Sequence, residues 1–179
     1  MKSLRDIFKR LPEDGKVRHE LRNFNMAPKA GGKVPSVKTL AESLGFCVER
    51  VRLPRGLAGR LVQDPFSENG YRIEVNMADN IFRQRWTVLH EMAHFFFHSD
   101  HNDPLAPAKL RDRNNPFYLA DEQKEEREAD EFAATLLFSD GALTAAQSLF
   151  GNDIQKLSRH FGASEAAIKI ALDDGNRRL

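Results

Sequence analysis

One short segment, Thr87–His98 with the sequence TVLHEMAHFFFH, constrains the fold more than any other part of the chain. Apolar residues recur at helical spacing through it and just before it, which predicts a helix over about Ile81–His98. The expected core stripe of this helix comprises Phe82, Trp86, Leu89, Ala93 and Phe96. Within the helix, His90 and His94 are four residues apart, so their side chains project from the same face.

His90, Glu91 and His94 form an H-E-x-x-H pattern, which on a helix is typical of a zinc-dependent hydrolase. The ring nitrogens of the two histidines can converge on one ion, and the glutamate can reach a water held there without being a ligand. Zinc lowers the pKa of such a water to about 7, which makes hydroxide available at neutral pH. The alternative is a buried aromatic helix whose imidazoles are only hydrogen-bonded.

A zinc site needs a third protein ligand, and the chain offers two kinds of solution. The metzincin spacing would place a glycine at 97 and a histidine at 100, where this chain has Phe97 and Asp100. His98 lies further around the helix from His90, so we predict that it supports a ligand rather than binding the ion. A carboxylate from another helix is therefore the expected third ligand.

The second strong helix, predicted over about Asp121–Phe138, supplies that carboxylate. Its apolar face comprises Ala129, Phe132, Ala133, Leu136 and Leu137. Continued backwards, the face includes Glu126, which we predict as a metal ligand, with Glu125 as its competitor because it borders the same face. Asp130, one turn after Glu126, is placed to accept a proton from the far nitrogen of a ligating histidine. Glu122, Glu128 and Glu131 are expected on the solvated side.

Three short strands, at about 46–51, 57–63 and 71–77, precede the first helix and are separated by turn clusters. The last strand alternates between apolar and polar residues, so one of its faces is expected to be wet. The fold class is therefore predicted to be α+β, with a small three-stranded antiparallel sheet packed on the active-site helix. The expected domains are an N-terminal arm and linker over 1–35, with a short helix near Leu4–Leu11, a core over 36–140, and a helical region over 141–179 that packs on the core.

Composition excludes several other classes of protein. The formal net charge is +1, so bulk charge does not favour a nucleic-acid binder, and the lone cysteine, Cys47, cannot form a disulfide framework. The N-terminal stretch has no apolar core of a secretory signal, and the apolar runs are too short to span a bilayer, which predicts a cytoplasmic protein. Residues 154–172 have helix-turn-helix spacing with a break at Gly162, but the second helix offers few groups that read base edges. Direct nucleic-acid binding is not expected.

The segments RQRWTVLHEMAHFFFH and EREADEFAATLL together resemble the ImmA/IrrE family of zinc metallopeptidases. Weaker similarity extends the resemblance over roughly residues 36–172. It implies a gluzincin-like catalytic domain with one zinc ion per chain on His90, His94 and Glu126, and with Glu91 as the general base. It also implies a metalloendopeptidase whose protein substrate is a helix-turn-helix repressor, in bacterial stress responses or mobile elements.

Several features stay open at this stage. Tyr118, His101 and His160 are the candidate donors to the oxyanion, and the substrate is expected to add as an extended strand beside Tyr71–Met77. The 99–120 segment, rich in Asp, Asn and Pro, is a candidate lid. Two histidines and a carboxylate also suit manganese or iron. The alternative function is a DNA-binding regulator, or a toxin–antitoxin or other interaction protein that holds zinc without turnover.

Overall fold

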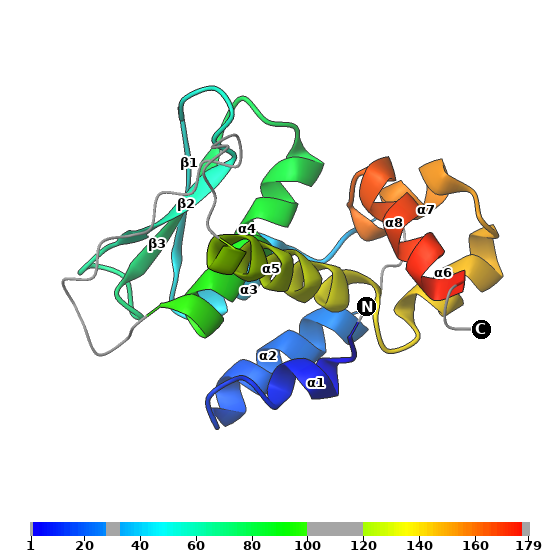
Figure 1. Cartoon of the computed structure of the whole chain (residues 1–179), viewed down its shortest axis with the longest axis horizontal. Coiled ribbons are helices and arrows are strands. Elements are labelled where there is room, and N and C mark those ends of the chain that lie inside the picture. The colour runs from blue at the N-terminus through cyan, green and yellow to red at the C-terminus, as the bar shows by residue number, and fades with distance from the viewer. Residues whose placement is uncertain (1, 28–32, 100–119, 177–179) are drawn as a thin grey trace. The chain divides into compact units, whose positions relative to one another are not determined.

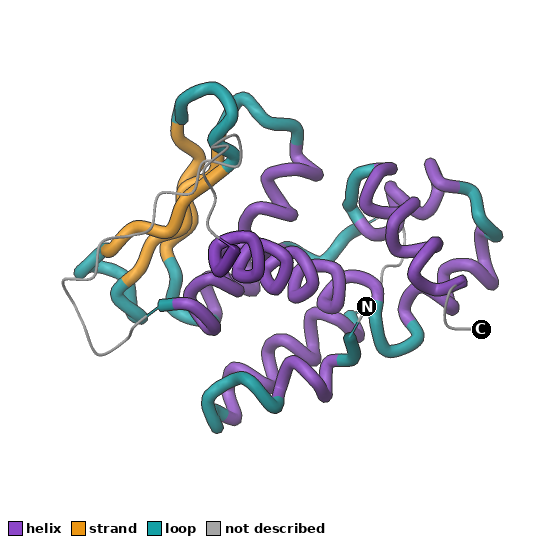
Figure 2. Tube along the Cα trace, viewed as in Figure 1, coloured by secondary structure: helices purple, strands orange, loops and turns teal. Residues whose placement is uncertain are grey.

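The computed structural model describes residues 2–27, 33–99 and 120–176 of the chain. Within these ranges the chain forms eight helices and one three-stranded sheet, so the α+β class is confirmed (Figures 1 and 2). The helices are α1 (Leu4–Phe8), α2 (Gly15–Met26), α3 (Val37–Ser43), α4 (Ile81–His98), α5 (Ala120–Phe138), α6 (Ala142–Phe150), α7 (Ile154–Phe161) and α8 (Glu165–Asn176). The strands are β1 (Cys47–Val51), β2 (Gly59–Gln63) and β3 (Tyr71–Asn76). No helix among the described residues has both the length and the apolar character needed to cross a membrane.

The chain divides into two compact units, and the boundary between them falls inside α5. One unit comprises Val37–Asp130, and the other comprises residues 1–36 together with 131–179. The first unit therefore contains the whole sheet, α4 and the first half of α5. The domain boundaries inferred from the sequence, at 35/36 and 140/141, stay a prediction.

The sheet has the strand order β1-β3-β2, so the last strand in sequence lies in the middle. β2 pairs with β3 antiparallel, as a hairpin, but β1 pairs with β3 in parallel. The prediction of a wholly antiparallel sheet is therefore wrong. The reason lies in the connection between β1 and β2, because Asn76 at the end of β3 donates from Nδ2 to the Leu57 carbonyl (2.9 Å). The segment that connects β1 to β2 thus passes the end of β3. β3 lies between these two strands, so β1 and β2 do not pair with each other as a hairpin.

The polar side of β3 is buried, which corrects the prediction of a wet face. Glu74 and Asn76 are each only 5% exposed. The Glu74 carboxylate is ion-paired with Arg60 of β2 (2.6 Å) and with Arg72 of its own strand (3.1 Å). The side chains of these two arginines accompany the carboxylate, and a buried polar group needs such partners within the protein.

α4 lies on β2 and β3 and has the bounds that the sequence predicts. It begins after Asn80, whose Oδ1 accepts from the Arg83 N–H at 3.0 Å. The contact with β2 is close at Gly59, because a Cβ there would collide with the Thr87 methyl group and lie 2.7 Å from the Glu74 carbonyl oxygen. Glycine at this position therefore allows α4 to approach the sheet one turn before His90.

The second unit contains helices from both ends of the chain. No element was predicted for residues 12–35, yet Gly15–Met26 forms α2. Asp14 caps α2 by accepting from the Lys16 N–H at 2.8 Å, and Leu21 and Phe24 are its buried apolar residues. The helix was missed because so few apolar positions give a weak periodic signal. The break between α7 and α8 falls at Gly162, as predicted, where φ is +61° and glycine is unstrained.

Candidate metal centre

The metal-centre residues predicted from sequence meet where α5 crosses α4 (Figure 1). The Nε2 atoms of His90 and His94 are 2.9 Å apart. Each also lies 3.2 Å from an oxygen of the Glu126 carboxylate, His90 from Oε2 and His94 from Oε1. His90 and His94 are 4% and 3% exposed, so water does not screen this cluster. Glu126 of α5, and not its competitor Glu125, is the carboxylate that joins the histidines in a group able to hold a metal ion.

The spacing of these donor atoms fits a zinc ion. With Zn–N and Zn–O bonds of about 2.0–2.2 Å, two tetrahedral ligand atoms lie about 3.3–3.6 Å apart. Here the two Nε2 atoms are 2.9 Å apart and each lies 3.2 Å from a different Glu126 oxygen, which is slightly below that range. One ligand atom from each of the three residues lies within 4.8 Å of the other two. With the three ligands that the described residues offer, a fourth position would stay open, which is the arrangement of catalytic rather than structural zinc sites.

Hydrogen bonding on the far side of His90 gives a second reason to place a cation here. The Nδ1 atom of His90 lies 2.9 Å from Asp130 Oδ1. Because an ionised carboxylate only accepts, Nδ1 carries the proton, and the Nε2 lone pair of neutral His90 faces the Glu126 carboxylate. This lone pair and the carboxylate repel one another unless a proton or a metal ion lies between them.

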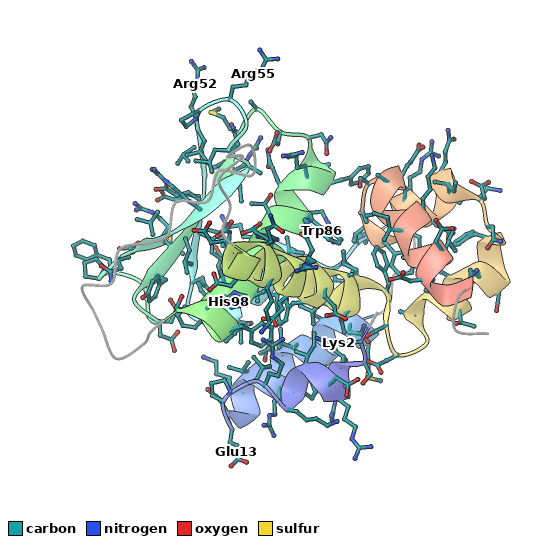
Figure 3. The ribbon with its side chains drawn as sticks, viewed as in Figure 1. Lys2, Glu13, Arg52, Arg55, Trp86 and His98 are labelled. Atoms are coloured by element: carbon teal, nitrogen blue, oxygen red, sulfur yellow. The ribbon has the colours of Figure 1, made fainter. Side chains whose placement is uncertain are left out.

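Asp130 is itself held by a second donor. The indole Nε1 of Trp86, one turn before His90 on α4, donates to the same Asp130 oxygen at 3.0 Å. Figure 3 shows Trp86 beside α5, where that bond is made. Asp130 therefore lies where the sequence placed it, and Trp86 fixes its orientation.

His94 has a different partner on its far side, which is another histidine. His94 Nδ1 lies 2.9 Å from His98 Nδ1, and His98 Nε2 lies 3.0 Å from Glu128 Oε2. The prediction that Glu128 is solvated is wrong, since its side chain is 20% exposed and contacts His98. The helical-wheel argument missed it because a glutamate side chain is long enough to reach around the flank of α5. The signal available in the sequence was His98, a buried imidazole that requires an acceptor.

The model of the IrrE N-terminal-like domain, Peptidase_M78, matches residues 50–173 of the chain. The chain belongs to the Peptidase_M78 family. This confirms the resemblance to the ImmA/IrrE family drawn from the two motifs. The matched segment includes the whole of α4 and α5, and with them every residue of the candidate metal centre. No curated protein matches the chain.

Glu91, the general base expected in this Peptidase_M78 chain, lies on α4 directly after His90 and is 9% exposed. Of the three candidate oxyanion donors, Tyr118 and His101 lie outside the described residues, as does most of the candidate lid over 99–120. His160 belongs to α7 in the other compact unit, where its ring contacts Phe150 and Phe161. Its role stays a prediction.

The opposite flank of α4 lines a separate hollow in the same unit of the Peptidase_M78 chain. This cavity has a volume of about 460 Å³ and is lined by Val37, Lys38, Val48, Glu49, Arg50, Val75, Ile81, Gln84, Arg85 and Val88. Burial lowers the pKa of Arg85 to about 10, so its guanidinium is still charged at neutral pH. None of the metal-centre residues lines this cavity, and the two sites are therefore distinct.

Proposed function

We propose that the chain is a zinc-dependent metalloendopeptidase that cleaves a specific intracellular protein. Membership of the Peptidase_M78 family supports a peptidase that acts on a protein substrate. The observation that carries the proposal is the convergence of His90, His94 and Glu126 beside Glu91, on donor spacings that fit one zinc ion. A helix-turn-helix repressor is the proposed substrate, on the strength of the family resemblance alone.

Each residue of the centre has a proposed part in hydrolysis. His90, His94 and Glu126 would hold the ion, which supplies a lowered water pKa and polarises the scissile carbonyl. Glu91 accepts a proton from the attacking water as the new C–O bond forms, and delivers it to the nitrogen when the C–N bond breaks. Burial keeps bulk water away from Glu91, and this strengthens its interaction with the proton that it transfers.

The prediction that the substrate pairs beside Tyr71–Met77 has to be revised. β3, which contains most of Tyr71–Met77, is the central strand and has no free edge, so a substrate cannot pair beside it. β2 is an edge strand that contacts α4, and no described strand pairs with its outer side. The Ala58 carbonyl accepts from the Asn76 N–H at 2.8 Å, so backbone groups of alternate residues face β3 and those between them face outward. The outward groups include those of Leu61 in the middle of β2, and we propose that the substrate backbone pairs there.

The test compares the wild type with Glu91→Gln and Glu126→Ala after chelation and reloading with zinc. Metal content is measured by mass spectrometry, and cleavage is measured on unfolded casein and on a panel of helix-turn-helix repressors. We expect one zinc ion per chain and cleavage of at least one substrate by the wild type. Glu91→Gln should retain zinc and lose cleavage, because it keeps the ligands and removes the base.

Two results would count against parts of the proposal. Cleavage by Glu91→Gln at the wild-type rate would overturn the role of Glu91. Zinc binding by the wild type with no cleavage of any probe would favour the alternative, an interaction protein that holds zinc without turnover. Weaker zinc retention by Glu126→Ala is expected in either case, because it reports on the ligand set and not on turnover.

A further inference from the structure

We propose that His98 and Glu128 are positioning residues that hold the metal ligand His94 through a directed chain of hydrogen bonds. This inference rests on the proposed metal centre and extends it to a pair of side chains from α4 and α5. The chain runs from His94 Nδ1 to His98 Nδ1 at 2.9 Å and from His98 Nε2 to Glu128 Oε2 at 3.0 Å. All three residues lie within the unit Val37–Asp130.

The donor in each of these hydrogen bonds can be inferred by starting from Glu128. An ionised Glu128 only accepts, so His98 Nε2 must donate to it. A neutral His98 then has its lone pair on Nδ1, so the facing His94 Nδ1 must donate. This leaves the lone pair of His94 on Nε2, which is the nitrogen that faces His90 and Glu126. The chain therefore selects the one His94 tautomer that can bind a metal ion at this centre.

Because these hydrogen bonds are buried, they are expected to contribute more to the orientation of His94 than a surface ion pair would. The His98 and His94 side chains are 6% and 4% exposed, and that of Glu128 is 20% exposed. The centre thus has two different supports, because His90 is backed directly by a carboxylate and His94 is backed through a second imidazole. His98 is also the last residue of α4, so its bond to Glu128 ties the end of that helix to α5 (Figure 3).

The magnitude follows from what such supporting groups contribute at other metal sites. Removing a group that orients a ligating histidine weakens metal affinity by about 10–100-fold. We therefore expect His98→Phe, which keeps an aromatic ring and removes both nitrogens, to weaken zinc affinity within that range. Glu128→Gln keeps an acceptor and loses the charge, so its effect should be smaller. Because Glu128 acts only through His98, the double variant should bind zinc no more weakly than His98→Phe alone.

The experiment measures zinc affinity by competition with a chromophoric chelator for the wild type, both single variants and the double variant. Glu131→Gln is the matched control, because it makes the same charge change on α5 at a residue that pairs with Lys2. Circular dichroism of the zinc-free proteins checks that each variant folds. With zinc on His94 Nε2, only Nδ1 can carry a proton, so long-range ¹H–¹⁵N spectra of the zinc-loaded proteins are used to measure the chemical shift and the exchange rate of that Nδ1 proton. Both depend on a hydrogen-bond partner at Nδ1, and a role of His98 in packing alone would not change them.

The expected result is weaker zinc binding by His98→Phe, a smaller loss in Glu128→Gln, and wild-type affinity in Glu131→Gln. In the zinc-loaded wild type, His94 should carry a slowly exchanging proton on Nδ1, and His98→Phe should lose this protection. Wild-type affinity and an unchanged His94 resonance in His98→Phe, or equal losses in Glu131→Gln and Glu128→Gln, would overturn the positioning role. A wild type that binds no zinc would instead refute the proposed metal centre itself.

Discussion

Replacing Gly59 by alanine tests the close contact between β2 and α4. The added Cβ would collide with the Thr87 methyl group and lie 2.7 Å from the Glu74 carbonyl oxygen. The methyl group can move only with a β-branched side chain of restricted rotamers, and the carbonyl belongs to the central strand of the sheet. Neither neighbour can give way cheaply, so α4 and β2 must separate.

Two opposing effects set the sign of the change in the free energy of unfolding. Gly59 is not among the glycines with positive φ, so its backbone conformation is allowed for alanine. Alanine lowers the conformational entropy of the unfolded chain, which alone would stabilise the folded protein by about 0.4–1 kcal/mol. Overpacking of a well-packed interior costs about 1–3 kcal/mol. We take a cost near the upper end because two atoms are approached at once, which gives a net destabilisation of about 2 kcal/mol. For a chain of this length that corresponds to a decrease in Tm of about 4–8 °C.

Thermal unfolding followed by circular dichroism measures the effect, and Gly15→Ala is the control. Nothing lies within 4 Å of a Cβ at Gly15, so that variant should show only the stabilising term. Thr87→Ser removes the colliding methyl group, and Gly59→Ala should therefore cost less in a Thr87→Ser background than in the wild type. A Gly59→Ala protein as stable as Gly15→Ala would refute the close contact.

Two further predictions concern single carboxylates. Asp130→Asn should weaken zinc affinity by about 10–100-fold, measured by chelator competition, because His90 Nδ1 loses an ionised acceptor, and unchanged affinity would contradict that role. Hydrogen bonds from the Ser3 side chain, and then from Lys9, lower the pKa of Asp6 from 3.8 to about 2. A lowered pKa stabilises the fold above pH 3.8, and this contribution is lost as the pH falls through about 2. Acid titrations followed by circular dichroism should show a difference in stability between the wild type and Asp6→Asn that shrinks over this pH range. A difference independent of pH would contradict the role given to these hydrogen bonds.

The features of this protein that could be predicted from the sequence are those that depend on the spacing of residues within one helix. The bounds of α4 follow from apolar spacing within one helix, and the positions of Glu126 and Asp130 follow from the apolar face of the next. The order of the strands was not predictable in the same way, because β1 and β3 are far apart in sequence and their pairing depends on tertiary packing. Glu128 was missed for a related reason, since its partner His98 belongs to another helix.

The outer edge of β2, with which no strand of the described ranges pairs, has a consequence for selectivity if the substrate binds there as proposed. An edge strand recognises a partner mainly through its peptide groups, and these are alike in every sequence. A segment already folded into a helix or a sheet has its peptide groups engaged and cannot pair there. The rate of cleavage would then depend on how often the partner opens locally, so that a change in the conformational stability of the substrate, rather than in its sequence, could regulate its destruction.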